Sequence, residues 1–303
     1  MKQISRDFFL FLSKNRTLNH GAKKWGLQLG ASKVVAGVTA ESAMKTVKSL
    51  NEKNLMCTVD HLGEFVTDKK EAKEAADYCQ RTLNLIAEYG VDCNLSLKLT
   101  QLGLDIDQDL CLNNMYNILL TAKKHGNFVR IDMEDYGHYQ LTLDILAELR
   151  KKFDNVGTVL QAYLYRAESD LDQLKGIPLR LVKGAYKESS DVAMQDKEKI
   201  DANFLTLIEK HLLNGSYTAI ATHDHSIIEH VKKFVRVHNL PKDLFEFQML
   251  YGFRNEMQLE LVKEGYRFRT YVPFGDDWYG YFMRRLAERP QNVAFAVKGL
   301  FSK

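Results

Sequence analysis

The sequence predicts an α/β protein, a parallel (β/α)8 barrel of the TIM type with a helical N-terminal arm. After residue 53, short β-rich runs alternate with polar stretches of helical pattern, at a mean period of roughly 30 residues. Several runs, such as Val-Gly-Thr-Val-Leu at 156–160, are apolar throughout, as expected for strands buried on both faces. Since no linker rich in Pro, Gly or Ser divides the chain, we expect residues 1–53 to form the arm and residues 54–303 the barrel.

The expected elements follow one another in regular order. The eight strands are Leu55–Asp60, Asn94–Leu99, Phe128–Met133, Thr158–Tyr163, Leu179–Val182, Tyr217–Thr222, Leu244–Met249 and Tyr266–Val272. Helical patterns lie between them, for example at Asp68–Tyr89, Asp109–Lys124 and Gln195–Leu213. In the arm, Thr39 can cap a helix that runs to Asn51.

Composition excludes several classes of protein. The net charge of +3 is too small to indicate a nucleic-acid partner. The four cysteines have no metal-ligand spacing and resemble the reduced thiols of a cytoplasmic protein. No apolar run approaches the roughly 18 residues of a membrane span. The short segment Phe8–Leu12 follows Arg6 and Asp7 and is a poor signal peptide.

Polar residues stand at the predicted strand ends, where the catalytic groups of such barrels gather. In order they are Asp60, His61 and Glu64; Lys98; Asp132 and Glu134; Gln161; Arg180 and Lys183; Thr222 and His223; Glu246 and Gln248; and, leading out of the last strand, Tyr271. Burying a polar group in or just past an apolar strand costs free energy unless the group has a hydrogen-bond or charge partner or binds a ligand. Their presence at every strand end favours a ligand site over scattered structural ion pairs.

The stretch from Tyr271 to Asn292 continues into a helix. We expect Pro273 and Gly275 to end the last strand, Asp276 or Asp277 to cap the helix, and Pro290 to stop it.

One face of that helix is cationic. Tyr281, Arg284, Arg285 and Glu288 stand at i, i+3, i+4 and i+7 and therefore share this face. Two adjacent guanidiniums suit a small carboxylate, because each can bind it through two parallel hydrogen bonds. The alternative is a solvated face on which Glu288 pairs with the arginines.

Other chemistries remain open from the residues alone. His223-Asp224-His225 is compatible with a metal site, although such a site normally needs further ligands. We therefore expect no bound metal. Lys98 or Lys183 could form a Schiff base in an aldolase-type barrel. A non-enzymatic barrel scaffold, with structural ion pairs at its strand ends, is the third reading. No Gly-x-Gly-x-x-Gly dinucleotide fingerprint occurs.

Seven motifs, in order along the chain, carry a resemblance to a known family. They are Ser96–Gly103 (Ser-Leu-Lys-Leu-Thr-Gln-Leu-Gly), Val129–Glu134 (Val-Arg-Ile-Asp-Met-Glu), Leu160–Tyr163, Arg180–Tyr186, Ala221–His223, Phe245–Leu250 and Tyr271–Asn292. Together they resemble proline dehydrogenase, and in length they resemble its short, monofunctional bacterial members. The resemblance extends from Cys57 to Asn292.

The resemblance implies a distorted (β/α)8 barrel that holds FAD and oxidises L-proline to Δ1-pyrroline-5-carboxylate, the first step of proline degradation. It implies hydride transfer from the ring carbon next to nitrogen to flavin N5, with electrons passed on to a membrane quinone. A separate pyrroline-5-carboxylate dehydrogenase would then take the product. As a hypothesis, the Val293–Lys303 tail or Phe8–Leu12 touches the inner membrane face near the quinone.

The resemblance also implies roles for individual residues. Lys98, Arg284 and Arg285 would bind the proline carboxylate, and Tyr271, Tyr281, Tyr186 and Leu250 would form the walls around the ring. Arg180 would lie near flavin N5, and Asp132 would orient a cationic side chain at the catalytic centre. The other cofactor contacts would be Met133, Gln161, Lys183, Gly184, Ala185, Thr222, His223 and Gln248. Glu64 would pair with Arg284 and act as a gate.

Overall fold

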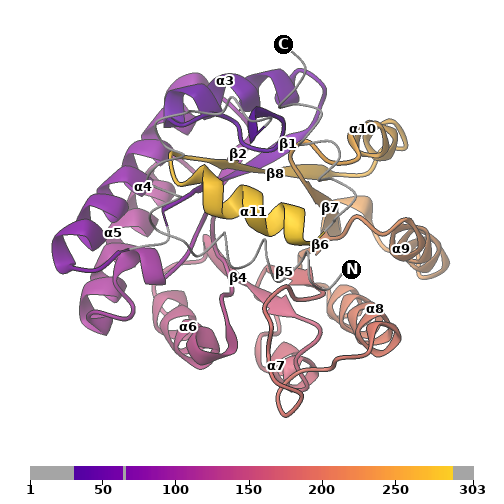
Figure 1. The fold of residues 1–303 in the computed structure, drawn as a ribbon. Coiled ribbons are helices and arrows are strands. Elements are labelled where there is room, and N and C mark those ends of the chain that lie inside the picture. Colours follow the sequence, from indigo (N-terminus) through magenta and orange to yellow (C-terminus); the bar gives the residue numbers. More distant parts are fainter. Residues whose placement is uncertain (1–30, 64–65, 289–303) are drawn as a thin grey trace.

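Eight parallel strands close into a barrel in sequence order (Figure 1). The computed structural model describes residues 31–63 and 66–288. The strands are β1 (Met56–His61), β2 (Cys93–Leu97), β3 (Val129–Ile131), β4 (Val156–Gln161), β5 (Leu179–Val182), β6 (Thr218–Ala221), β7 (Phe245–Leu250) and β8 (Phe268–Phe274). Parallel pairing of β1 with β8, in which Val59 lies opposite Val272, closes the barrel. The predicted fold class is confirmed.

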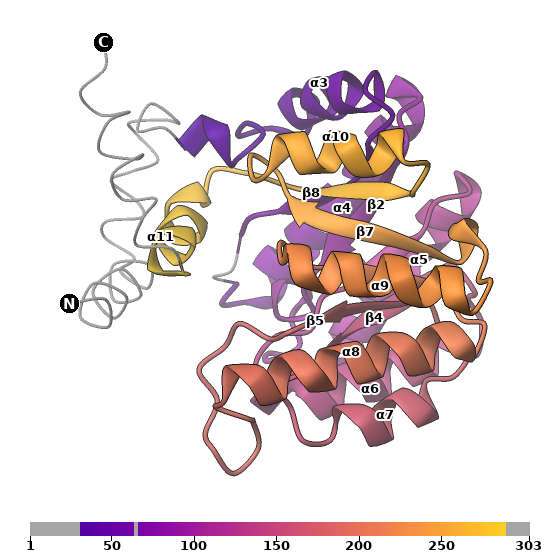
Figure 2. The ribbon, with the colours of Figure 1, turned by 90° about the vertical axis from the view of Figure 1, so that its right-hand side faces the viewer.

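Helices surround this barrel as an outer ring (Figures 1 and 2). They are α3 (Ala40–Asn51), α4 (Lys69–Tyr89), α5 (Gln108–Lys124), α6 (Tyr136–Arg150), α7 (Ala167–Gln173), α8 (Lys197–Leu213), α9 (His225–Val237) and α10 (Asn255–Lys263). A further helix, α11 (Trp278–Glu288), lies outside this ring. Short 3-10 turns are η2 (Ala31–Lys33), η3 (Thr100–Leu102) and η4 (Lys242–Leu244). The helices α4, α5, α6, α8 and α9 each begin after an aspartate whose carboxylate accepts a backbone N–H.

Two local expectations have different outcomes. Thr39 caps α3 as predicted, because its hydroxyl accepts the Ser42 N–H at 3.2 Å and the Ser42 hydroxyl accepts the Thr39 N–H at 3.2 Å. The predicted end of the last strand at Pro273 is wrong, because β8 continues to Phe274. Pairing of β7 with β8 has already ended at Tyr271, so no strand on that edge needs the N–H that proline lacks.

The two faces of the strands differ in polarity. Side chains that alternate outward, such as Val59, Leu95 and Ile131, are buried in one apolar cluster together with the surrounding helices. Residues between them, such as Ser96 and Arg130, are buried inside the barrel and form hydrogen bonds across it. Apolar packing therefore takes place outside the sheet, while the interior is left for polar groups.

Helix α11 crosses the opening of the barrel in Figure 1 and lies beyond one end of it in Figure 2. It follows β8 directly, so this end is the one where the strands have their carboxyl termini. Trp278, Tyr281 and Phe282 of α11 are buried with Ala31 and Val35 in a second apolar cluster. This packing sets which face of α11 turns toward the barrel.

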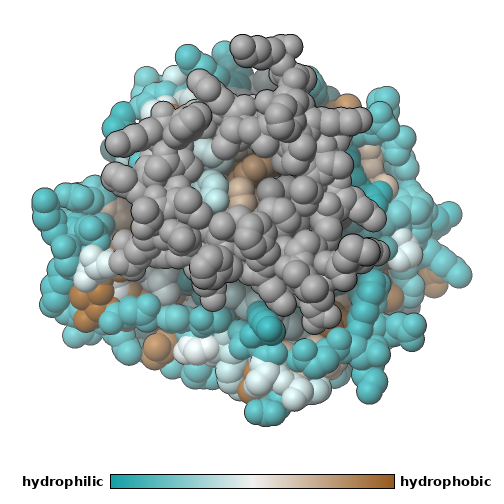
Figure 3. All heavy atoms as spheres, in the orientation of Figure 1, coloured by the Kyte–Doolittle hydropathy of each residue, from teal (hydrophilic) through white to brown (hydrophobic). Residues whose placement is uncertain are grey.

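Figure 3 shows the molecule from the side on which α11 crosses the barrel opening. The visible surface of the described residues is mainly hydrophilic there, and its hydrophobic residues are scattered. Large exposed apolar side chains in the described part, such as Leu120 on α5 and Val237 on α9, lie on different helices. Scattered residues of this kind are normal for a protein surface and indicate no binding site.

Gly157 on β4 provides a test of packing inside the barrel. A Cβ at this position would lie 2.1 Å from the Pro178 carbonyl oxygen and 2.9 Å from Arg130 Nη1. We expect Gly157→Ala to lower the free energy of unfolding by about 1–3 kcal/mol, measured by urea denaturation, because a backbone carbonyl cannot easily move away.

The matched control for this substitution is Gly137→Ala in α6. A Cβ there meets only Asp135 Oδ1 at 3.4 Å, and alanine favours the helix, so stability should be unchanged or higher. Equal stability of Gly157→Ala and the native chain would contradict the packing described here.

Candidate active site

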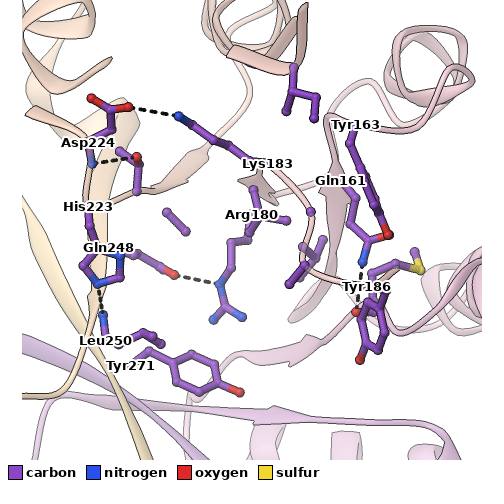
Figure 4. Close-up of a pocket in the computed structure, with 18 of the residues that line it drawn as sticks. Gln161, Tyr163, Arg180, Lys183, Tyr186, His223, Asp224, Gln248, Leu250 and Tyr271 are labelled. Atoms are coloured by element: carbon purple, nitrogen blue, oxygen red, sulfur yellow. Dashed lines mark hydrogen bonds and ion pairs between the residues drawn. The ribbon is translucent and has the colours of Figure 1, made fainter. Parts of the chain in front are cut away.

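A cavity of about 1120 Å³ opens at the carboxyl ends of the strands (Figure 4). Most of the side chains predicted for the site line it. They are Lys98, Asp132, Met133, Gln161, Arg180, Lys183, Gly184, Ala185, Tyr186, Thr222, His223, Gln248, Leu250, Tyr271 and Arg285. These residues lie on, or follow, seven strands (β2 to β8) and α11, so the fold brings together groups far apart in sequence.

The remaining predicted residues are placed differently. Tyr281 is buried in the apolar cluster of α11, and the Arg285 guanidinium lies over its ring at 5.2 Å. Arg284 is half-buried on the same helix and is not among the residues that line the cavity. Glu64, the expected gate, lies outside the described residues, as does the Val293–Lys303 tail.

An ion pair between Asp132 and Arg180 forms the centre of the site. Arg180 Nη1 donates to Asp132 Oδ1 at 2.6 Å, and both residues are at least nine-tenths buried. The Ser96 hydroxyl donates to the same carboxylate oxygen at 2.7 Å. Arg180 Nε donates to Gln248 Oε1 at 2.7 Å, which fixes the plane of the guanidinium (Figure 4).

Lys98 and Tyr271 join this centre to a second carboxylate, Asp60. Lys98 Nζ donates to Asp60 Oδ2 at 2.9 Å. The Tyr271 hydroxyl lies 2.7 Å from Asp60 Oδ2 and 2.8 Å from Asp132 Oδ2, and the Arg180 guanidinium is 5.2 Å from its ring centroid. Burial, together with the nearby Asp132 and Asp60, raises the pKa of Tyr271 well above its usual value, so the phenol keeps its proton.

Glu134 holds the segment that carries Lys98. Its carboxylate accepts the Thr100 N–H at 3.1 Å and the Thr100 hydroxyl at 2.6 Å. Burial raises the pKa of Glu134 above its usual value. Gln161 Nε2 donates to the Glu134 carbonyl at 3.0 Å, whereas Gln161 Oε1 is buried with no hydrogen-bond partner among the described residues. This oxygen is therefore available to a bound ligand.

A lysine with two acidic partners lies at the other end of the cavity. Lys183 Nζ pairs with Asp224 at 3.0 Å and with Asp201 at 2.5 Å. Hydrogen bonds from Ser226, followed by those from Lys183, lower the pKa of Asp224 well below its usual value.

Gly184 follows Lys183 with φ +112, and a Cβ there would come within 2.2 Å of the Tyr163 ring. Only glycine therefore fits beside this ring.

The predicted histidine has a structural partner. His223 Nε2 accepts the Leu250 N–H at 3.2 Å, so this nitrogen is unprotonated (Figure 4). Asp224 caps α9 and pairs with Lys183, so it is engaged with protein groups. Within the described ranges, no group of three or more His, Cys, Asp or Glu side chains could hold a metal ion.

Tyr163, Ser96 and Asp201 contribute to the site but were not predicted. Ser96 could have been found from its position two residues before Lys98, since alternate residues of a strand share a face. Asp60 was recognised as a strand-end residue but was given no role. Asp201 lies on α8 and reaches Lys183 only through the fold, so the sequence carries no local signal for it.

The fold and the cavity define a barrel of the enzyme type, with a charged ligand site at the carboxyl ends of its strands. A family model described as proline dehydrogenase matches residues 43–298. The chain therefore belongs to the proline dehydrogenase family, whose members are oxidoreductases of the first step in proline catabolism.

Individual relatives agree with this assignment. Proline dehydrogenase 2 of Bacillus subtilis strain 168 is 54% identical over 302 residues, covering 99% of this chain and 100% of the relative. Proline dehydrogenase of Deinococcus radiodurans is 43% identical over 286 residues, covering 92% and 91%. These lengths confirm the resemblance to the short, monofunctional members.

Solved structures show the same fold in a larger protein. Proline utilization A from Bdellovibrio bacteriovorus matches with a TM-score of 0.83 and 25% identity, covering 99% of this chain and 38% of that chain. Proline utilization A from Bradyrhizobium japonicum has a TM-score of 0.75 and 23% identity, and the match covers 88% of this chain and 32% of that chain. This chain thus spans well under half the length of either. None of the helices that the structure describes is long and apolar enough to cross a membrane.

Removing Asp132 tests whether Arg180 depends on it. Asp132→Ala leaves a buried guanidinium without its carboxylate, so we expect a loss of about 3–5 kcal/mol in the free energy of unfolding. Urea denaturation measures this loss. Glu148→Ala, which breaks an exposed pair with Lys151, should cost less than about 1 kcal/mol and serves as the control. Equal effects of the two substitutions would show that the Asp132 pair is not buried in solution.

Proposed function

We propose that this protein oxidises L-proline to Δ1-pyrroline-5-carboxylate with FAD as its cofactor. The observation that carries the proposal is the buried Asp132–Arg180 pair, linked to Lys98 and Tyr271 at one end of a large cavity. An amino acid with one carboxylate and one ring presents an anionic handle and a small apolar body. The site offers matching cations and an aromatic wall.

The cavity suits FAD in size and in the chemistry of its lining. Its volume of about 1120 Å³ exceeds the roughly 300–1,000 Å³ of ordinary small-molecule pockets. Gln161 Oε1 is a buried acceptor that a ligand N–H can satisfy. At the far end, Lys183 is suited to a phosphate group, and Gly184 allows the backbone to approach it closely. Met133, Ala185, Thr222, His223 and Gln248 would complete the cofactor contacts.

The proposed substrate site lies between the central ion pair and α11. Lys98 and Arg285, which both line the cavity, would bind the proline carboxylate. Arg284 would join them, with Glu64 as its partner in closing the site. Tyr271, Tyr186 and Leu250 would hold the ring, and Tyr281 would support Arg285 from beneath.

Positioning is the main contribution of the protein to the reaction. When bound, the flavin supplies the acceptor for the hydride that leaves the ring carbon next to nitrogen. Arg180, held by Asp132 and Gln248, presents a fixed positive charge to the cavity. Asp132 accepts hydrogen bonds from Ser96 and Arg180 and contacts the Tyr271 hydroxyl, so we assign it an orienting role rather than that of a free base.

The proposed electron acceptor is a membrane quinone. Each two-electron oxidation of proline must be followed by removal of those electrons, and a lipid-soluble acceptor would bring the protein to the membrane surface at least transiently. The product is chemically an imine acid that a separate pyrroline-5-carboxylate dehydrogenase would oxidise further.

The central test is spectroscopic. The purified protein should be yellow or should take up added FAD, and L-proline should bleach the flavin absorbance in the absence of oxygen. Vesicles that contain a quinone should restore the absorbance, and co-sedimentation with them would reveal membrane contact. A colourless protein that takes up no FAD would overturn the cofactor assignment. Bleaching that quinone cannot reverse would overturn the acceptor alone.

Arg284 and Arg285 test the substrate site. Arg284→Lys and Arg285→Lys should each raise the KM for proline by roughly tenfold or more, because an ammonium cannot reproduce the two parallel hydrogen bonds of a guanidinium. A five-membered ring acid with oxygen in place of the amine nitrogen cannot form an imine. It should inhibit competitively, and its inhibition should weaken in parallel with proline binding.

The control for these variants is Arg236→Lys, on the exposed side of α9. Flavin content, measured by absorbance, should be the same in all three variants. A native KM and a native inhibition constant in both α11 variants would mean that their arginines form only a solvated face.

A further inference from the structure

The Tyr271 hydroxyl lies between two carboxylates, and both contacts are short. Its oxygen is 2.7 Å from Asp60 Oδ2 and 2.8 Å from Asp132 Oδ2, within the range of O–H···O hydrogen bonds. A phenol has one hydrogen, so it can donate to only one of them. If both carboxylates were unprotonated, one of the two contacts would have no hydrogen in it, and the lone pairs of the phenol oxygen and of a carboxylate oxygen would repel each other. A second proton is therefore required on one carboxylate.

The partners of the two carboxylates show which one holds this proton. Asp132 Oδ1 accepts from the Ser96 hydroxyl at 2.7 Å and from the Arg180 guanidinium at 2.6 Å, which stabilise a negative charge. Asp60 is 2 % exposed, and its Oδ1 has no hydrogen-bond partner among the described residues. A buried charged oxygen without a donor is costly, so the proton is more stable on Asp60.

The charged and titratable groups around Asp60 come from each element packed against it. Lys98 at the end of β2 and a hydrogen bond from Tyr271 on β8 favour the ionised carboxylate, whereas burial and Asp132 after β3 oppose it. Cys79 on α4 lies on the outer side, and burial raises its pKa to about 12, so it stays neutral. Burial, followed by Asp132, raises the pKa of Asp60 in spite of Lys98.

We propose that Asp60 is a protonated positioning residue of the substrate site, which donates its proton to the Tyr271 oxygen and adds no negative charge beside Lys98, the residue that would bind the substrate carboxylate. Tyr271 then donates its own hydrogen to Asp132. The order of donors, from Asp60 to Tyr271 to Asp132, holds the phenol ring that forms one wall of the cavity. The role of Lys98 in this statement rests on the proposed function, whereas the proton on Asp60 does not.

Infrared spectroscopy of the resting protein tests the proton without any turnover. The native protein at neutral pH should show the C=O stretch of a protonated carboxylic acid, and this band should be absent from Asp60→Asn. Glu134→Gln is the matched control, because Glu134 is also a buried carboxyl but accepts two hydrogen bonds from Thr100. The band should persist in that variant. A native spectrum without the band, or a band that survives Asp60→Asn, would overturn the proposal.

Kinetics with two substitutions at the same position test the positioning role. Lys98 and Tyr271 both contact Asp60 Oδ2, so an asparagine amide nitrogen at that position can donate to the Tyr271 oxygen as a neutral carboxylic acid does, although it cannot accept from Lys98. Alanine can do neither. We expect Asp60→Asn to retain at least tenfold more kcat/KM for proline than Asp60→Ala, and the loss in Asp60→Ala to appear mainly in KM. If Asp60 were an ionised partner of Lys98, both substitutions would be similarly damaging, and that result would overturn the positioning role.

Thermal denaturation of each variant separates these effects from loss of folding. If the native protein does not oxidise proline at all, the proposed function fails, while the infrared band still decides whether Asp60 holds the proton. The two failures are thus distinguishable.

Discussion

The buried ion pair between Asp132 and Arg180 is the interaction on which the site depends. It joins the end of β3 to β5 across the barrel, and through Ser96 and Gln248 it reaches β2 and β7. Removing both charges from water costs several kcal/mol per ion, so such a pair is poor evidence for stability. The ion pair instead fixes the geometry of the site, because each member restricts the rotamers of the other and of their neighbours. A charge fixed in this way can act on a ligand without reorganising.

A second set of charged residues inside the barrel contacts the Asp132–Arg180 pair through Gln248. The Glu246 carboxylate accepts Arg269 Nε at 2.9 and 3.0 Å, and Gln248 donates to Glu246 while it accepts from Arg180. Arg130 donates to the Thr158 and Pro178 carbonyls, and burial lowers its pKa to about 9, which still leaves it charged at neutral pH. These described residues of the interior therefore form a connected polar network. Stability comes instead from the apolar packing between the sheet and its helices.

At the far end of the cavity, single residues also serve more than one structural role. Asp224 both caps α9 and pairs with Lys183, so the start of a helix and the orientation of a cation depend on one carboxylate. Gly184 packs its backbone against the Tyr163 ring, which leaves no room for any side chain. Lys183 and the Gly184 backbone lie at this end of the cavity, and the opposite end holds the Asp132–Arg180 ion pair.

Much of this protein is determined by sequence alone. Alternation of short β-rich runs with helical patterns predicts eight strands in a barrel, because parallel strands need helical crossovers between them. Polar residues such as Lys98 and Asp132 stand directly after strands, and a barrel brings all such strand ends to one face. Thr39 and the aspartate caps are equally readable, since a cap acts within three residues of itself.

Only the tertiary structure decides the remaining features. The residues of α11 that turn toward the cavity depend on how Trp278 and Phe282 pack, so Arg285 lines the cavity while Tyr281 is buried beneath it. Pro273 stays within β8 because β7 has stopped pairing beside it. Asp60 meets Asp132 through Tyr271, and these residues are up to 211 positions apart in the chain. Local pattern reports which face of an element is polar, but contacts between elements depend on their relative rotation and register, which are set when the whole core packs.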